Sequence, residues 1–186
     1  MFFKSLHLIA RKYFLFCTKI TLMRNFLLLL ISIAIFACQS EPNSLSTWSD
    51  LNLLEHGIPF SILAPDSAKV ETIDFGNIMK DVTVRGGDDY FVQIFASDAK
   101  TTDVNKLKTE ALNEVKEEKH FSKIIEESDQ GFIYESKRDS TTTYYGFRYV
   151  KLQGTKEYIL QNGFRGFFTE NQARAMFKAV AIPAKK

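Results

Sequence analysis

The sequence contains few of the residues that most often carry out chemistry in enzymes. It has three histidines and two cysteines in 186 residues. His56 and His120 have no second histidine within a helical turn, as a two-histidine metal site on one helix would need. His120 follows a charged run at the end of a predicted helix. The ordinary interpretation is that His120 is a cation that interacts with the C-terminal end of the helix dipole. Neither histidine therefore predicts a catalytic base or a metal ligand.

The sequence also lacks the motifs of other catalytic sites. No glycine-rich phosphate loop precedes a predicted helix, and no serine or cysteine nucleophile motif is present. Glu117–Glu118 and Glu126–Glu127 are neighbours in sequence, and neighbours do not face each other on a helix or a strand. Gly86–Asp89 holds too few carboxylates for a calcium loop and predicts a hairpin turn. We therefore expect a protein that is not an enzyme and has no cofactor and no metal site.

Long hydrophobic runs are scarce, and the longest is too short to span a bilayer. Apolar residues continue from Phe26 to Ala37, broken only by Ser32. About twelve helical residues extend roughly 18 Å, whereas a bilayer core is roughly 30 Å thick and needs about 20 apolar residues. Arg24 precedes the run, and no acidic residue occurs before Glu41. This arrangement predicts a secretory signal sequence.

The end of this run resembles the lipobox of bacterial lipoproteins. Ile35 is an aliphatic residue three places before Cys38, and Ala37 is a small residue directly before it. The resemblance implies cleavage between Ala37 and Cys38, a diacylglycerol thioether on Cys38, and an acyl chain such as palmitate on the new amino terminus. Two or more acyl chains attach a protein stably to a membrane. The alternatives are an uncleaved membrane anchor and a buried core helix.

The segment before the run is long and basic for a signal sequence. Met23 is the better start, so we expect translation to begin there; the alternative is a long leader from the first residue. Either start leaves residues 1–37 as a signal region. Residues 38–50 then form a lipidated flexible tether, in which Trp48 either packs on the domain or marks a contact surface. Residues 51–186 form a single domain.

Removal of the leader changes the charge of the protein. It takes five of the 24 basic residues and none of the 22 acidic ones, which leaves 19 basic residues and a net charge of −3. No basic patch remains that predicts nucleic-acid binding. Cys38 is then the one cysteine, which excludes a disulfide and a cysteine zinc site. Gln39 after Cys38, in place of an aspartate, resembles the outer-membrane sorting pattern, so we expect the outer membrane rather than the inner membrane.

Alternating apolar residues between turn-forming residues predict a series of strands in the domain. The predicted strands cover residues 58–64, 68–71, 81–85, 90–97, 122–127, 132–137, 144–152 and 157–168.

Two segments change to the spacing of a helix. The first is predicted at residues 103–119, with apolar residues spaced by three and four along one face. The second begins at Thr169–Gln172, whose first and last residues are those of a capping box. The apolar stripe that follows predicts core packing and consists of Ala173, Met176, Phe177 and Val180.

The order of these elements predicts an α+β domain with an antiparallel sheet of about six strands flanked by helices. This order resembles the Mog1/PsbP-like fold, an α/β/α sandwich. The matching features are the opening strand Ile58–Ile62 that leads to Ala64–Pro65, the charged central helix, the aromatic hairpins and the closing helix. The resemblance spans about residues 56–182, and no functional residue is carried over from it, because fold alone does not define function.

The aromatic strand at residues 144–152 offers a candidate contact surface. Tyr145, Phe147 and Tyr149 share one face, which forms either the core or, if it is open, a binding surface. We therefore expect a non-catalytic binding or assembly module that lipidated Cys38 holds near an envelope protein partner. The alternative is a periplasmic carrier of a small apolar ligand, with a pocket under the aromatic strands.

Overall fold

The computed structural model describes residues 47–76, 78–164 and 166–182 of the chain. The predictions for the signal region, the start at Met23, the lipidation of Cys38 and most of the tether lie outside these residues.

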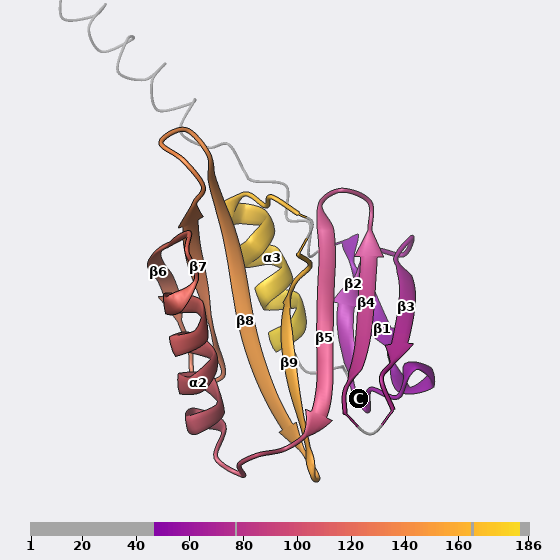
Figure 1. Cartoon of the computed structure of the whole chain (residues 1–186). Helices are drawn as coiled ribbons and strands as arrows, with labels where there is room; N and C mark the ends of the chain where they lie inside the picture. The colour runs from indigo at the N-terminus through magenta and orange to yellow at the C-terminus, as the bar shows by residue number, and fades with distance from the viewer. Residues whose placement is uncertain (1–46, 77, 165, 183–186) are drawn as a thin grey trace, which may run out of the picture. The chain divides into compact units, whose positions relative to one another are not determined.

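Most of the strands form one antiparallel sheet (Figure 1). They are β3 Lys69–Asp74, β4 Lys80–Gly86, β5 Tyr90–Asp98, β6 Phe121–Glu127, β7 Gly131–Lys137, β8 Thr143–Gln153 and β9 Lys156–Asn162. Their order across the seven-stranded sheet is β3-β4-β5-β9-β8-β7-β6. A separate antiparallel pair consists of β1 Ser49–Asn52 and β2 Ser61–Ala64, and the short 3-10 helix η2 Leu54–His56 lies between them in the chain.

The described residues include two α-helices, which cover opposite faces of the sheet (Figure 1). In the view of Figure 1, α2 Val104–Glu117 lies in front of β6, β7 and β8, while α3 Glu170–Ala181 lies behind the sheet together with β1 and β2. Alternate residues of β7 follow this division: Ile133 packs in the core under α3, and Phe132 and Tyr134 pack under α2. No helix among the described residues is long and apolar enough to cross a bilayer.

The predicted α+β class is confirmed, and the main sheet has seven strands where about six were expected. The strand expected at residues 58–64 contributes only Ser61–Ala64, because the chain before it forms η2 and a turn. Its partner β1 begins at Ser49, two residues before the expected start of the domain. Trp48 packs on the domain, with its ring centroid 4.9 Å from that of Tyr90.

The last strand is shorter than predicted. β9 ends at Asn162, whereas the strand was expected to reach Phe168. At Gly163 a side chain would meet the ring of Phe91 at 2.4 Å, so the chain can pass this ring only with a glycine. Phe168 returns to the sheet as an isolated bridge to Tyr145.

The closing helix begins as predicted. Thr169 Oγ1 accepts the backbone N–H of Gln172 at 3.3 Å, and the Gln172 side chain accepts the backbone N–H of Thr169 at 2.8 Å. The predicted stripe is buried at all four positions. Its Phe177 ring makes edge contacts with the rings of Phe147 and Tyr149, at 6.1 and 5.7 Å between centroids. These ring contacts stabilise the packing of α3 on β8.

We expect Phe177→Ala to lower the free energy of unfolding by about 3–5 kcal/mol, because it removes a buried ring and leaves a cavity. Urea denaturation of the purified protein measures this loss. Ile78→Ala is a matched control, since Ile78 is 80% exposed, and we expect it to change stability by less than about 0.5 kcal/mol. Equal losses in the two variants would contradict the core position of Phe177.

Candidate functional site

The aromatic face of β8 lies in the core and not at the surface. Phe147 and Tyr149 are 0% and 6% exposed, because α3 covers this face. Tyr145 is half-buried at the edge of the same face. Of the two interpretations of these three residues, core packing therefore holds for Phe147 and Tyr149.

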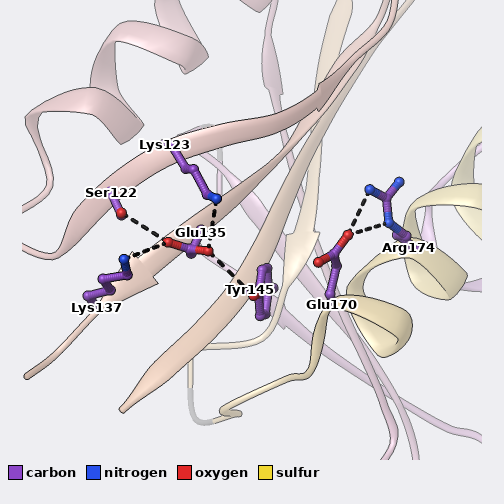
Figure 2. Close-up of polar contacts among 7 residues, drawn as sticks. All are labelled: Ser122, Lys123, Glu135, Lys137, Tyr145, Glu170 and Arg174. Atoms are coloured by element: carbon purple, nitrogen blue, oxygen red, sulfur yellow. Dashed lines mark hydrogen bonds and ion pairs between the residues drawn. The ribbon is translucent and has the colours of Figure 1, made fainter. Parts of the chain in front are cut away.

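Glu135 is the centre of a polar cluster on β6, β7 and β8 (Figure 2). Its Oε1 accepts a hydrogen bond from Ser122 Oγ at 3.0 Å and lies 3.3 Å from Lys137 Nζ. Its Oε2 lies 3.6 Å from Lys123 Nζ and 3.4 Å from the hydroxyl of Tyr145. Burial raises the pKa of the Glu135 carboxyl, but the hydrogen bonds from Ser122 and Lys137 and the two lysine charges outweigh it, so the pKa lies below its usual value.

This cluster fastens strands together and is poorly suited to acid–base chemistry. A carboxylate whose pKa is lowered is a weak base, and burial and the charge of Glu135 raise the pKa of Tyr145, which keeps its hydroxyl protonated. Figure 2 also shows Arg174 of α3 paired with Glu170 at 2.8 Å, and Arg174 forms a second ion pair with Glu126 of β6. These contacts hold β6, whose register with β7 shifts twice, to the rest of the domain.

An accessible hollow of the domain lies on β3, β4 and β5, on the face that α3 does not cover. In Figure 1 no described element lies in front of these three strands, since α2 packs farther along the sheet. Val82 and Val84 of β4 point into the core, so the residues between and beside them point into this hollow. Its volume is about 700 Å³. We call it the β3–β5 groove, and its lining includes Glu71, Ile73, Asp81, Thr83, Phe91 and Gln93.

A row of polar side chains crosses the floor of the groove. Gln93 is 8% exposed, and its amide donates to Asp81 Oδ2 at 2.8 Å. The other oxygens of both side chains, Asp81 Oδ1 and Gln93 Oε1, are enclosed without a hydrogen-bond partner among the described residues. Gln161 lies opposite Gln93 on β9. Its Nε2 is also enclosed without a hydrogen-bond partner among the described residues. Buried polar atoms are nearly always paired in proteins, so these three enclosed atoms are exceptions that lie beneath the groove or beside it.

Cations and apolar side chains border the groove. The guanidinium of Arg85 lies over the ring of Phe91, 4.7 Å from its centroid. Ile73, at the end of β3, lines the groove and is 56% exposed. The loop that follows carries Phe75 and Ile78, which are 50% and 80% exposed and do not line the groove.

The two histidines among the described residues, His56 and His120, lie away from the groove. His56 Nδ1 lies 3.1 Å from Thr72 Oγ1, and neither residue lines the groove. His120 follows α2, and its backbone carbonyl accepts the N–H of Lys137 at 2.8 Å. In the part of the chain that the structure describes, no three histidine, cysteine or acidic side chains are grouped to hold a metal ion.

Lys151 is a half-buried cation on the α3 side of β8. Its Nζ lies 4.4 Å from the ring centroid of Phe60 and 5.5 Å from that of Tyr149. Burial lowers the pKa of Lys151 to about 8. The amine is therefore still mostly charged at neutral pH, where the two aromatic faces stabilise it, and it does not take part in the groove.

The groove was not predicted from the sequence, although part of its signal is visible there. The alternation of Val82 and Val84 with polar residues predicts a strand with one polar face. Gln93 interrupts the apolar run of the next strand, where a buried polar residue is unusual. The polar residues of the two strands lie side by side because Thr83 pairs with Gln93. This pairing is known only from the register of the sheet.

Comparison with models of known protein families found no match to this chain. A search of curated proteins also found no match.

We expect Glu135→Gln to lower the free energy of unfolding by roughly 1 kcal/mol at pH 7, because the neutral amide loses the attraction of the two lysines. The folded-state pKa of Glu135 is lowered, so the contribution of its charge is present above the unfolded-state pKa of about 4.3 and is lost as the pH falls through the folded-state value. The gap between the two proteins should therefore shrink between about pH 5 and pH 3.

Urea denaturation at pH 7 and pH 3 measures this gap. Glu110→Gln, at an exposed position of α2, is the control and should change stability little at either pH. A gap for Glu135→Gln that is the same at both pH values would show that the charge of Glu135 does not stabilise the fold.

Proposed function

We propose that the protein is a lipid-anchored envelope lipoprotein that acts as a non-catalytic binding or assembly module. The β3–β5 groove is its partner surface. The observation that carries this proposal is the uncovered half of the sheet, where a hollow of about 700 Å³ combines polar side chains with the exposed Ile73 near the end of β3. A protein partner uses both, because interfaces combine apolar anchors with a polar surround.

The lining of the groove supports binding rather than catalysis. Its charged groups are two cations, Lys69 and Arg85, and three carboxylates, those of Glu71, Asp81 and Asp88. Asp81 is engaged by the amide of Gln93, and no histidine, serine–base pair or cysteine lies among the lining residues that could act as a nucleophile with its base. We therefore assign no reaction to the groove.

The lipid anchor and the finer fold relationship belong to the same proposal. The lipobox-like sequence that ends at Cys38 supports attachment to the cell envelope, with the outer membrane favoured by Gln39. The position of α2 and α3 on opposite faces of an antiparallel sheet supports a relationship to the Mog1/PsbP-like fold.

A protein partner fits the groove better than a small apolar ligand does. A carrier of such a ligand was expected to hold it under the aromatic strands, where Phe147 and Phe177 fill the space. The hollow lies instead over β3 to β5 and is lined largely by polar and charged side chains. Pockets for small apolar molecules bury most of the ligand surface, whereas this hollow lies on an uncovered face of the sheet.

We expect Cys38→Ala to release the protein from the membrane fraction, because the acyl chains need the cysteine thiol and the amino terminus that cleavage exposes. Fractionation of cells followed by immunoblotting measures this. Cys17→Ala, which changes the other cysteine of the chain, is the matched control and should leave the protein in the membrane fraction. Unchanged membrane attachment of Cys38→Ala would refute the lipid anchor.

We expect a photo-crosslinking amino acid at position 83, in the groove, to give an adduct of defined mass with one envelope protein in living cells. The same amino acid at Asn113, an exposed position of α2, should not give this adduct. Asp81→Ala in the position-83 protein should weaken the adduct, because it removes a polar group of the groove floor. Equal adducts from positions 83 and 113 would contradict the groove as the partner surface.

A further inference from the structure

The two edges of the main sheet differ in a way that points to one of them as a docking edge. β6, at one edge, has two register shifts against β7. Bulges of this kind keep an edge from pairing with another strand. β3, at the other edge, pairs with β4 without a shift from Lys69 to Asp74. The regular edge is also the one that borders the groove.

The backbone groups that β3 presents outward can be assigned from its hairpin. The backbone N–H of Phe75 donates to the carbonyl of Met79 at 2.9 Å, and this pair continues the register of β3 with β4. Hydrogen-bonded and non-hydrogen-bonded pairs alternate along an antiparallel ladder. The backbone groups of Val70, Thr72 and Asp74 therefore point away from β4. No other described strand pairs with β3.

We propose that β3 accepts an extended segment of the protein partner, which adds to the sheet as an antiparallel strand. This inference rests on the proposed function and names the kind of partner that the groove binds. The added strand hydrogen-bonds to the outward backbone groups of Val70, Thr72 and Asp74. Its side chains on the groove face extend the wall of the groove beside Ile73. Addition of a strand to a free sheet edge is a common form of peptide recognition.

The side chains of β3 define the chemistry of this segment. On the groove face β3 presents Lys69, Glu71 and Ile73 in turn. Directly opposed side chains are close in an antiparallel pair, and opposite charges stabilise it. The matching segment therefore has an apolar residue opposite Ile73, a basic residue opposite Glu71 and an acidic residue opposite Lys69. Read in its own direction, the pattern is apolar-x-basic-x-acidic.

A second copy of this chain matches β3 less well. In the two antiparallel registers with the greatest overlap of β3 with itself, Glu71 lies opposite either Glu71 or Ile73 of the second copy. Neither arrangement gives the carboxylate a cation, and like charges directly opposite one another are destabilising. Charge thus favours a partner strand of different sequence.

Two synthetic peptides test the proposal with the full chain as it is purified from cells. The matched peptide is acetyl-Thr-Ile-Thr-Arg-Val-Glu-amide, and the control is acetyl-Thr-Ile-Thr-Glu-Val-Arg-amide, in which the charges are exchanged. Titration followed by NMR should show tighter binding of the matched peptide by roughly threefold or more. The amides of Val70, Thr72 and Asp74 should shift and exchange their hydrogens more slowly in the complex. Binding of neither peptide, or equal binding of both, overturns the proposal.

Two substitutions separate the backbone contribution from the charge contribution. Thr72→Pro removes an outward N–H and leaves the pairing with β4 intact, so it should abolish binding, whereas Thr72→Val keeps this N–H and should retain it. Glu71→Arg does not depend on the tolerance of the strand for proline. It should abolish the preference between the two peptides, because each peptide then has one favourable and one unfavourable charge pair with β3. Full binding by a folded Thr72→Pro protein, or an unchanged preference in Glu71→Arg, contradicts strand addition. Dimerisation through β3 would do so too, because the edge would then belong to a second copy.

These results are distinguishable from those that test the proposed function. If the peptides fail to bind but the crosslink at position 83 persists, the groove still binds a partner and only the proposal of strand addition is refuted. If Cys38→Ala stays on the membrane, the lipid anchor is refuted. This outcome has no bearing on whether the peptides bind to β3.

Discussion

The contact between α3 and the aromatic face of β8 is the packing interaction on which the other surfaces of the domain depend. Phe177 fits against Phe147 and Tyr149, and the rings leave no open face on this strand. The capping box at Thr169 starts the helix at the position that brings this stripe onto the sheet. Because α3 takes one face with the β1–β2 pair beside it, the β3–β5 groove forms on the other face.

That other face is only half covered. α2 brings its apolar stripe to the strands at the β6 end, and the three strands at the β3 end keep polar side chains directed outward. Burial of Gln93 without full pairing costs stability, whereas an apolar residue there would fill the same space at no such cost. This half of the sheet, with exposed Ile73 beside it, is where we propose that the partner binds.

The charged side chains at the two edges of the main sheet also differ in whether they are paired. At the β6 edge Glu135 and Arg174 are paired with oppositely charged neighbours, and these pairs secure an edge whose register is irregular. At the β3 edge Lys69 and Glu71 are exposed on a regular strand. The charges at one edge thus serve the fold, while those at the other are available to a partner that approaches from solvent.

The sequence alone determined the local features, because these depend on residues that are close together in the chain. The capping box at Thr169, the buried stripe that contains Phe177, the central helix and the β4–β5 hairpin all follow from spacing and turn chemistry. The lipobox-like segment that ends at Cys38 is equally local, and it stays a prediction. The tertiary structure decided which aromatic face is covered and where the groove lies. Both depend on the order of strands in the sheet, and that order is set by the burial of surfaces from residues far apart in the sequence.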